Sequence, residues 1–160
     1  AVDPERESLF QAHLLNITGT RRFALSDESK QKLKRYVERG GVVFAEAACG
    51  SEAFDQSFHA LIKELYPDRE LEELPSGHPL WKLGRPLEDV RYSNTVRQAE
   101  PDLRRPILEY VEVDGRAAIL YSRFDLSSAI AGHPCLACPA VLEPSAGELM
   151  LKIVLYALSG

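Results

Sequence analysis

In the first third of the chain, short apolar runs typical of buried strands alternate with segments whose apolar residues recur with the period of a helix. The nearly continuous apolar run HLLNITG, at 13–19, ends in glycine and predicts a buried strand. Val42-Val43-Phe44-Ala45 predicts a second buried strand. Each run precedes a segment with a helical period, so we expect a right-handed parallel α/β unit.

Capping residues define the two predicted helices. Ser26 precedes two acids and is a suitable N-cap for the first helix. Gly40-Gly41 terminates that helix. Ser51 caps the second, and Pro67 stops it. The apolar residues that share one helix face are Leu33, Tyr36 and Val37 in the first, and Phe54, Phe58, Leu61, Ile62 and Leu65 in the second.

The remainder of the chain is less regular. Residues 67–106 hold six of the ten prolines and no sustained period, so we predict a long irregular connection. Two β runs around Asp114-Gly115 predict a β-hairpin over 107–122. Another irregular stretch, 123–145, follows. The closing segment GELMLKIVLYALS, at 147–159, is apolar almost all round and predicts a buried helix.

Size and charge restrict the class of protein. The 160 residues are enough for one domain with its own core, and we expect a single α/β domain over 1–160. The net charge of −5, with scattered basic residues, argues against binding nucleic acid or anionic membranes. The longest apolar stretch, 149–158, is too short for a membrane span, and no signal peptide is recognisable at the N-terminus. We therefore expect a soluble segment.

Cys49 is the first candidate for chemistry. It follows the second predicted strand and directly precedes a helix N-terminus, where the helix dipole favours thiolate over thiol. The alternative is a small buried residue that fills a tight corner.

The segment HPCLAC, at 133–138, is the second candidate. His133, Cys135 and Cys138 could supply three zinc ligands, with Cys49 as a conceivable fourth. A structural zinc site normally uses two separated pairs, and a redox Cys-x-x-Cys normally starts a helix, whereas this one lies between two prolines. We therefore predict no metal and no cofactor, and interpret the segment as loop packing or one disulfide.

Several motifs in order resemble a known family. FALSDES, YVERGGVVFAEAACGSEAFDQSF, LPSGHPLW, DGRAAILYSRFDLSS and IVLYAL resemble the bacterial family called domain of unknown function 4159, from about Leu14 to Leu158. The resemblance implies a flavodoxin-like, class I glutamine amidotransferase-like or ThuA-like three-layer sandwich with a mostly parallel sheet. It also implies a place in the C-terminal part of a larger protein with upstream membrane segments. Members usually carry a further strand and helix first, so the first strand is expected to be missing here.

The resemblance also bears on catalysis. Amidotransferases of this superfamily use a Gly-x-Cys-x-Gly elbow and a late His-x-Glu pair. Here Ala47 and Ser51 replace the two glycines around Cys49, and the nearest histidine match, His133, is followed by Cys135 in place of the acid. Residues other than glycine enter a strained turn less freely, and without the acid nothing orients the imidazole.

A ligand crevice is predicted where the strands end, because ligands of doubly wound sheets bind at the carboxyl ends of strands. The predicted ligand-binding residues are Gly19, Glu46, Cys49, Ser51 and Asp125. Glu46, Asp55 and Asp125 leave a paired-carboxylate hydrolase open, and structural roles as a cap or an ion pair are as good an interpretation.

The turn at Cys49 lacks both glycines of the amidotransferase motif, and His133 lacks the acid that would orient it. The leading functional prediction is therefore a non-catalytic ligand-binding or protein-interaction module. The alternative is a Cys-dependent hydrolase or amidotransferase-like enzyme that uses Cys49 and His133. The partner and compartment are not indicated by the residues. A homo-oligomer is a further alternative, in which another chain covers apolar surface left by the missing strand.

Overall fold

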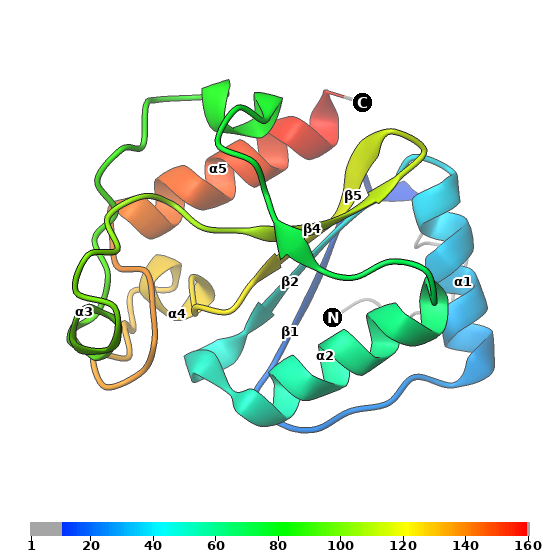
Figure 1. Cartoon of the computed structure of the whole chain (residues 1–160), viewed down its shortest axis with the longest axis horizontal. Helices are drawn as coiled ribbons and strands as arrows, with labels where there is room; N and C mark the ends of the chain where they lie inside the picture. Colours follow the sequence, from blue (N-terminus) through cyan, green and yellow to red (C-terminus); the bar gives the residue numbers. More distant parts are fainter. Residues whose placement is uncertain (1–10, 160) are drawn as a thin grey trace.

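A computed structural model describes residues 11–159 as one five-stranded sheet with helices on both faces (Figure 1). The strands are β1 (Leu14–Gly19), β2 (Val42–Ala47), β3 (Glu72–Glu73), β4 (Glu109–Val113) and β5 (Arg116–Ser122). The helices are α1 (Asp27–Glu38), α2 (Glu52–Leu65), α3 (Asn94–Ala99), α4 (Ser127–Ile130) and α5 (Ser145–Leu158). Two 3₁₀ turns are η2 (Ala48–Gly50) and η3 (Pro79–Lys82).

The sheet is mixed, with the strand order β1-β2-β5-β4-β3. β1, β2 and β5 run parallel, whereas β5, β4 and β3 pair antiparallel. The prediction of a mostly parallel sheet was therefore wrong, although the α/β class and the hairpin over 107–122 are confirmed. The physical reason is that the hairpin enters the sheet as a unit: β5 pairs with β2, and β4 then carries β3 on its other edge.

The two predicted helices form where their caps place them. Ser26 Oγ accepts a hydrogen bond from Ser29 N at 3.2 Å, and Ser51 Oγ accepts one from Phe54 N at 3.3 Å. Gly40 follows the first helix with φ 93°, a left-handed conformation that suits glycine. Local sequence thus determines both helix starts and the first helix end.

The two stretches predicted as irregular contain short elements that the pattern did not reveal. β3 and α3 lie within 67–106, and α4 lies within 123–145. β3 has two residues and α3 has six, which is too short for a hydrophobic period to develop. Ser93 caps α3 through a 3.4 Å hydrogen bond from Val96 N.

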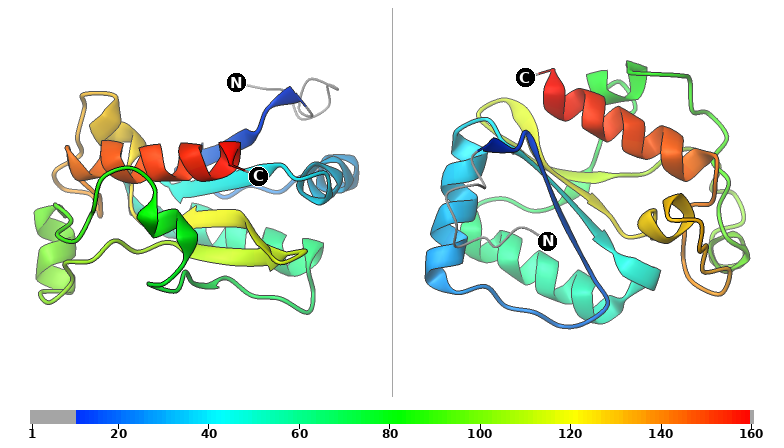
Figure 2. Two further views of the ribbon diagram at one scale, coloured as in Figure 1. Left: turned by 90° about the horizontal axis from the view of Figure 1, so that it is seen from above. Right: turned by 180° about the vertical axis from the view of Figure 1, so that it is seen from behind.

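Apolar side chains form a core on each face of the sheet, and the ribbon shows three layers, with α5 on one side and α1 and α2 on the other (Figures 1 and 2). Alternate residues of β2 point into opposite cores, Val42 and Phe44 toward α5, Val43 and Ala45 toward α1 and α2. Because both faces are covered, β2 is apolar along most of its length.

Lys152 anchors the loop after η3 to helix α5. It is 1% exposed, and its Nζ donates to the carbonyl oxygens of Trp81 at 3.1 Å, of Arg85 at 2.6 Å and of Leu83. Burial lowers the pKa of this amine. The three carbonyl groups offset the cost of removing the ammonium group from water.

From the surroundings of His78 we expect the stability of the folded protein to depend on pH. Its Nδ1 accepts a hydrogen bond from Leu80 N at 3.2 Å, which requires the unprotonated nitrogen, and burial lowers the pKa of the ring. The unfolded chain then binds the proton more readily, so His78 should reduce stability as pH falls below about 6.5. We expect the urea midpoint to fall between pH 7 and 5, and to fall less in His78→Asn, whose amide caps without titrating. Equal slopes in both proteins would contradict this role.

Two expectations concern the ends and surroundings of the domain. β1 forms one edge of the sheet among the described residues, so a missing first strand stays a prediction. In the same part of the chain, no helix combines the length and apolar character required to cross a membrane.

Candidate functional site

The carboxyl ends of the three parallel strands meet at one end of the sheet, beside α4 (Figure 1). The register pairs Gly19 with Ala47 and Glu46 with Ser122, so the strands end side by side. The predicted crevice residues come from these strand ends and from the turns that follow them.

Cys49 lies in the sharp turn η2 between β2 and α2. Its φ of 55° places it in the left-handed region, which is rare for a residue with a side chain and costs backbone energy. Gly50 follows with φ 63°, and a Cβ there would lie 2.7 Å from the ring of Pro139. The turn therefore exposes Cys49 and brings the backbone of Gly50 against the segment that carries Cys138.

The buried carboxylate of Asp125 ties this turn to two other segments. Its Oδ2 accepts from Cys49 N at 2.7 Å, and its Oδ1 accepts from Ser128 N at 2.9 Å. Its backbone N–H donates to Pro139 O at 3.1 Å, and its carbonyl accepts from Val141 N at 2.9 Å. Asp125 is thus the junction between the elbow, α4 and the strand-like segment after the Cys-x-x-Cys.

Glu46 supports the same junction from inside the protein. It is fully buried, and its Oε2 accepts from Leu126 N at 2.8 Å and Ser127 N at 3.2 Å, while Oε1 accepts from Ser127 Oγ. A buried carboxylate requires such partners, because a carboxylate left unpaired away from water is very costly.

The three cysteines of the chain converge beside Asp125. Cys138 Sγ lies within disulfide-bonding distance of both Cys49 Sγ and Cys135 Sγ, and the two outer sulfurs are 3.6 Å apart. Cys49 is exposed, Cys135 is half-buried, and Cys138 is 4% exposed. Three sulfurs this close can exchange a disulfide or share a metal ion.

His133 is exposed on the loop before the Cys-x-x-Cys. Its backbone N–H donates to Ser128 O at 2.9 Å. Within residues 11–159, no hydrogen bond joins its ring to Cys49, whose sulfur contacts the other two sulfurs.

Gly19 and Ser51 shape the same edge of the sheet. A Cβ at Gly19 would lie 2.9 Å from the ring of Phe54, so glycine allows α2 to pack against the end of β1. Ser51 caps α2 and also donates from Oγ to Thr20 O at 2.9 Å. Both residues fit the α2 N-terminus against the strand ends.

Asp55 does not join Glu46 and Asp125 in a carboxylate cluster. It accepts a 2.6 Å hydrogen bond from Tyr121 OH, and His59 Nε2 lies 3.5 Å from its carboxylate and 3.9 Å from that of Glu109. Burial, and then the hydrogen bond to Asp55, raise the pKa of Tyr121, and burial raises that of Glu109. No sequence signal predicts this group, because strand pairing joins Glu109 to Tyr121 and the packing of α2 adds Asp55 and His59.

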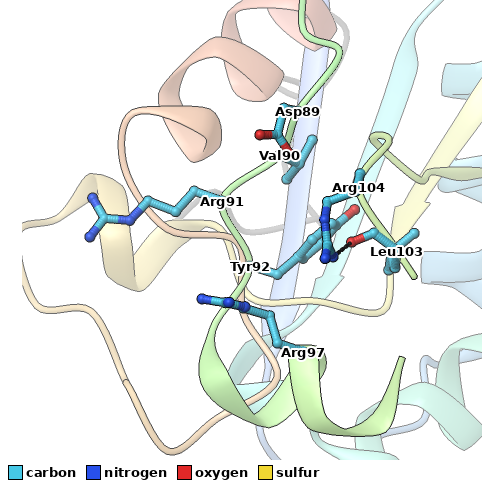
Figure 3. A pocket seen from close by; sticks show the side chains of 7 residues that line it. All are labelled: Asp89, Val90, Arg91, Tyr92, Arg97, Leu103 and Arg104. Carbon is cyan, nitrogen blue, oxygen red and sulfur yellow. Dashed lines mark hydrogen bonds between the residues drawn. The ribbon is translucent and has the colours of Figure 1, made fainter. Parts of the chain in front are cut away.

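An arginine-lined hollow of about 390 Å³ was also missed by the sequence analysis (Figure 3). Its lining residues are Asp89, Val90, Arg91, Tyr92, Arg97, Leu103 and Arg104. Arg104 Nη1 donates to the carbonyl oxygens of Pro101 at 2.8 Å and Leu103 at 3.0 Å. The side chains of Arg91 and Arg97 both extend away from Arg104 (Figure 3). A neighbouring hollow also contains Arg97 and Arg104. The arginines were visible in the sequence, but nothing in their spacing placed them together.

The family model described as "Domain of unknown function (DUF4159)" matches residues 1–158, nearly the whole chain. No curated protein matches it.

Proposed function

Since the chain belongs to the family described as Domain of unknown function (DUF4159), we propose its function from its own geometry: a binding or protein-interaction module that does not catalyse acyl transfer. The observation that carries the proposal is the environment of Cys49. Its N–H is held by the Asp125 carboxylate at 2.7 Å, and its sulfur contacts Cys135 and Cys138 instead of a general base.

The carboxylate of Asp125 opposes the charges that acyl transfer creates. A nucleophilic cysteine needs a stabilised thiolate, and the tetrahedral intermediate needs donors aimed at an oxyanion. Asp125 places negative charge at the elbow and occupies the Cys49 N–H. A like charge beside this N–H disfavours the oxyanion, and the N–H that could have donated to the oxyanion is already engaged. The Cys-dependent hydrolase, with Cys49 and His133, is the second candidate and would require both residues to rearrange.

The scaffold is proposed to be flavodoxin-like and related to class I glutamine amidotransferases. The parallel strands β1, β2 and β5, the helix α1 between β1 and β2, and the turn that leads from β2 into α2 support this relationship. We also propose that the domain forms the C-terminal part of a larger, membrane-tethered bacterial protein, on the strength of the family resemblance.

The arginine-lined hollow is where we propose that a ligand binds. The side chains of Glu46, Ser51 and Asp125 are engaged in internal hydrogen bonds, so we assign them to building the strand edge. Arg97 is exposed beside Arg104, and a guanidinium fork is suited to a carboxylate or phosphate. The ligand class is therefore a molecule with an anionic group.

Acyl-transfer activity should be absent in the fully reduced protein. We expect glutamine and p-nitrophenyl acetate to be hydrolysed at the same rate by the wild type and by Cys49→Ser, because the elbow lacks a base and an open donor. Product release is followed spectrophotometrically after removal of the reductant. A burst of one product per chain that disappears in both Cys49→Ser and His133→Ala would establish the enzyme instead.

Arg97→Ala should weaken anion binding by about tenfold, the effect of losing one charge-assisted contact of about 1.4 kcal/mol. Isothermal titration with inorganic pyrophosphate measures this, and binding should weaken further as salt is added. Arg69→Ala is the matched control, since Arg69 is an exposed arginine outside the hollow. Equal losses in the two variants would show that the anion responds to overall charge and not to this hollow.

A further inference from the structure

The three cysteines offer two disulfides that cannot exist together. Cys138 is paired with Cys49 across 89 residues and with Cys135 across three, with Cα–Cα distances of 4.8 and 5.3 Å. Both distances lie in the range usual for disulfides. A sulfur forms one disulfide at a time, so either Cys49 or Cys135 is left as a thiol.

The three sulfurs differ in accessibility to solvent, so each is suited to a different role in thiol–disulfide exchange. Cys138 is buried and central, Cys135 is half-buried, and Cys49 is exposed at the left-handed turn. The backbone around Cys138 is fixed, because its carbonyl accepts from Ser93 Oγ at 2.7 Å. Asp125 Oδ2 fixes the backbone of Cys49. The framework thus holds all three sulfurs within reach of one another.

We propose that Cys49, Cys135 and Cys138 form a thiol–disulfide exchange centre. The Cys49 thiolate attacks Cys138 Sγ in the Cys135–Cys138 disulfide. The Cys49–Cys138 bond forms, the Cys138–Cys135 bond breaks, and the electron pair leaves on Cys135 Sγ, which takes a proton from water. The number of disulfides is unchanged, so this step needs no oxidant.

An external disulfide loads the centre when all three cysteines are reduced. The exposed Cys49 thiolate attacks it, forms a mixed disulfide and releases one thiol. The Cys138 thiolate then attacks the Cys49 sulfur and releases the second thiol. The external disulfide gains two electrons, and the Cys49–Cys138 pair loses two. This inference goes beyond the proposed binding function and does not depend on it.

Three neighbouring thiolates are also ligands for zinc, which is the competing use of the same cluster. Within the described residues the cluster offers three such ligands, whereas a structural zinc site usually has four. Zinc binding by the reduced protein must therefore be measured beside its reaction with disulfides.

The experiment oxidises reduced protein with oxidised glutathione, traps it in acid, alkylates free thiols and maps the bonds by mass spectrometry after trypsin. Cys49 lies in the peptide 40–63, and Cys135 and Cys138 share the peptide 124–152. We expect two isomers: 40–63 linked to 124–152 through Cys138, and 124–152 closed internally with Cys49 alkylated. Fragmentation identifies which cysteine of 124–152 carries the label.

Cysteine variants separate the steps. Cys135→Ser should form Cys49–Cys138, and Cys49→Ser should form Cys135–Cys138. In the double variant Cys135→Ser/Cys138→Ser, glutathione should remain on Cys49 about tenfold longer than in the wild type, or more, because both thiols that reach Cys49 are gone.

Three results would overturn the proposal. One is a single disulfide isomer in the wild type, together with no disulfide at all in the variant that lacks the outer cysteine of that isomer. The second is a loss of glutathione from Cys49 that is as rapid in Cys135→Ser/Cys138→Ser as in the wild type. The third is reduced protein that binds one equivalent of zinc through all three sulfurs, remains unreactive toward oxidised glutathione, and regains reactivity with a chelator.

Discussion

Replacing Glu46 with alanine is expected to lower the free energy of unfolding by about 3–5 kcal/mol, because each hydrogen bond to a charged group contributes about 1.5–3 kcal/mol and the regained hydration cost of the carboxylate offsets part of the sum. The carboxylate is fully buried and accepts from Leu126 N, Ser127 N and Ser127 Oγ. Alanine leaves these donors without their acceptor at the start of α4. Urea denaturation under reducing conditions, followed by circular dichroism, measures the loss.

Two further variants make this measurement specific. In Glu46→Gln the amide oxygen can still accept from the backbone N–H groups, so we expect about half of the alanine effect. Glu88→Ala removes an exposed acid and should change stability by no more than about 0.5 kcal/mol. If Glu46→Ala were as stable as Glu88→Ala, Glu46 could not be the support of the strand edge.

The strands and helices of residues 13–66 could be predicted because each leaves a local signature. β2 is apolar along most of its length because both faces of the sheet are covered, and α1 and α2 begin at serines whose hydroxyls accept helix N–H groups. The hairpin around Asp114-Gly115 was equally visible, since Asp114 and Gly115 both adopt positive φ there.

The order of the sheet could not be predicted in the same way. β3 consists of Glu72 and Glu73, both exposed, which pair with β4 through their backbone alone. Nor does any side-chain pattern specify that β5 inserts beside β2. Such pairings depend on the balance of the whole fold and leave little trace in a local window.

The candidate site illustrates the same limit. The sequence placed Cys49 at a strand-to-helix turn and named it as a conceivable companion of the Cys-x-x-Cys. What joins them is a parallel bridge between Asp125 and Ala140 and the contact of Gly50 with Pro139. Neither is encoded in the spacing of the cysteines.

Oxidation is expected to stabilise Cys135→Ser, which retains Cys49 and Cys138, by about 4–5 kcal/mol, and Cys49→Ser by about 1–2 kcal/mol. The cause is the length of chain that each bond closes, 89 residues for Cys49–Cys138 and three for Cys135–Cys138. Cross-linking a longer loop removes more conformational freedom from the unfolded chain. Thermal unfolding of each variant with and without dithiothreitol measures the gain, at about 2–4 °C per kcal/mol for a chain of this size.

Comparing the two redox states of one variant cancels the effect of the substitution itself. Equal gains in both variants, or no gain in Cys135→Ser, would contradict the long-range cross-link.

The two disulfides differ by about 3 kcal/mol in how much they stabilise the folded protein. This difference must also appear in the disulfide-exchange equilibrium of the wild type, because folding and disulfide exchange form a closed thermodynamic cycle. Folding should therefore raise the ratio of Cys49–Cys138 to Cys135–Cys138 about 100-fold. Oxidised wild type held in urea at neutral pH should move its disulfide to Cys135–Cys138, and dilution into buffer should return it.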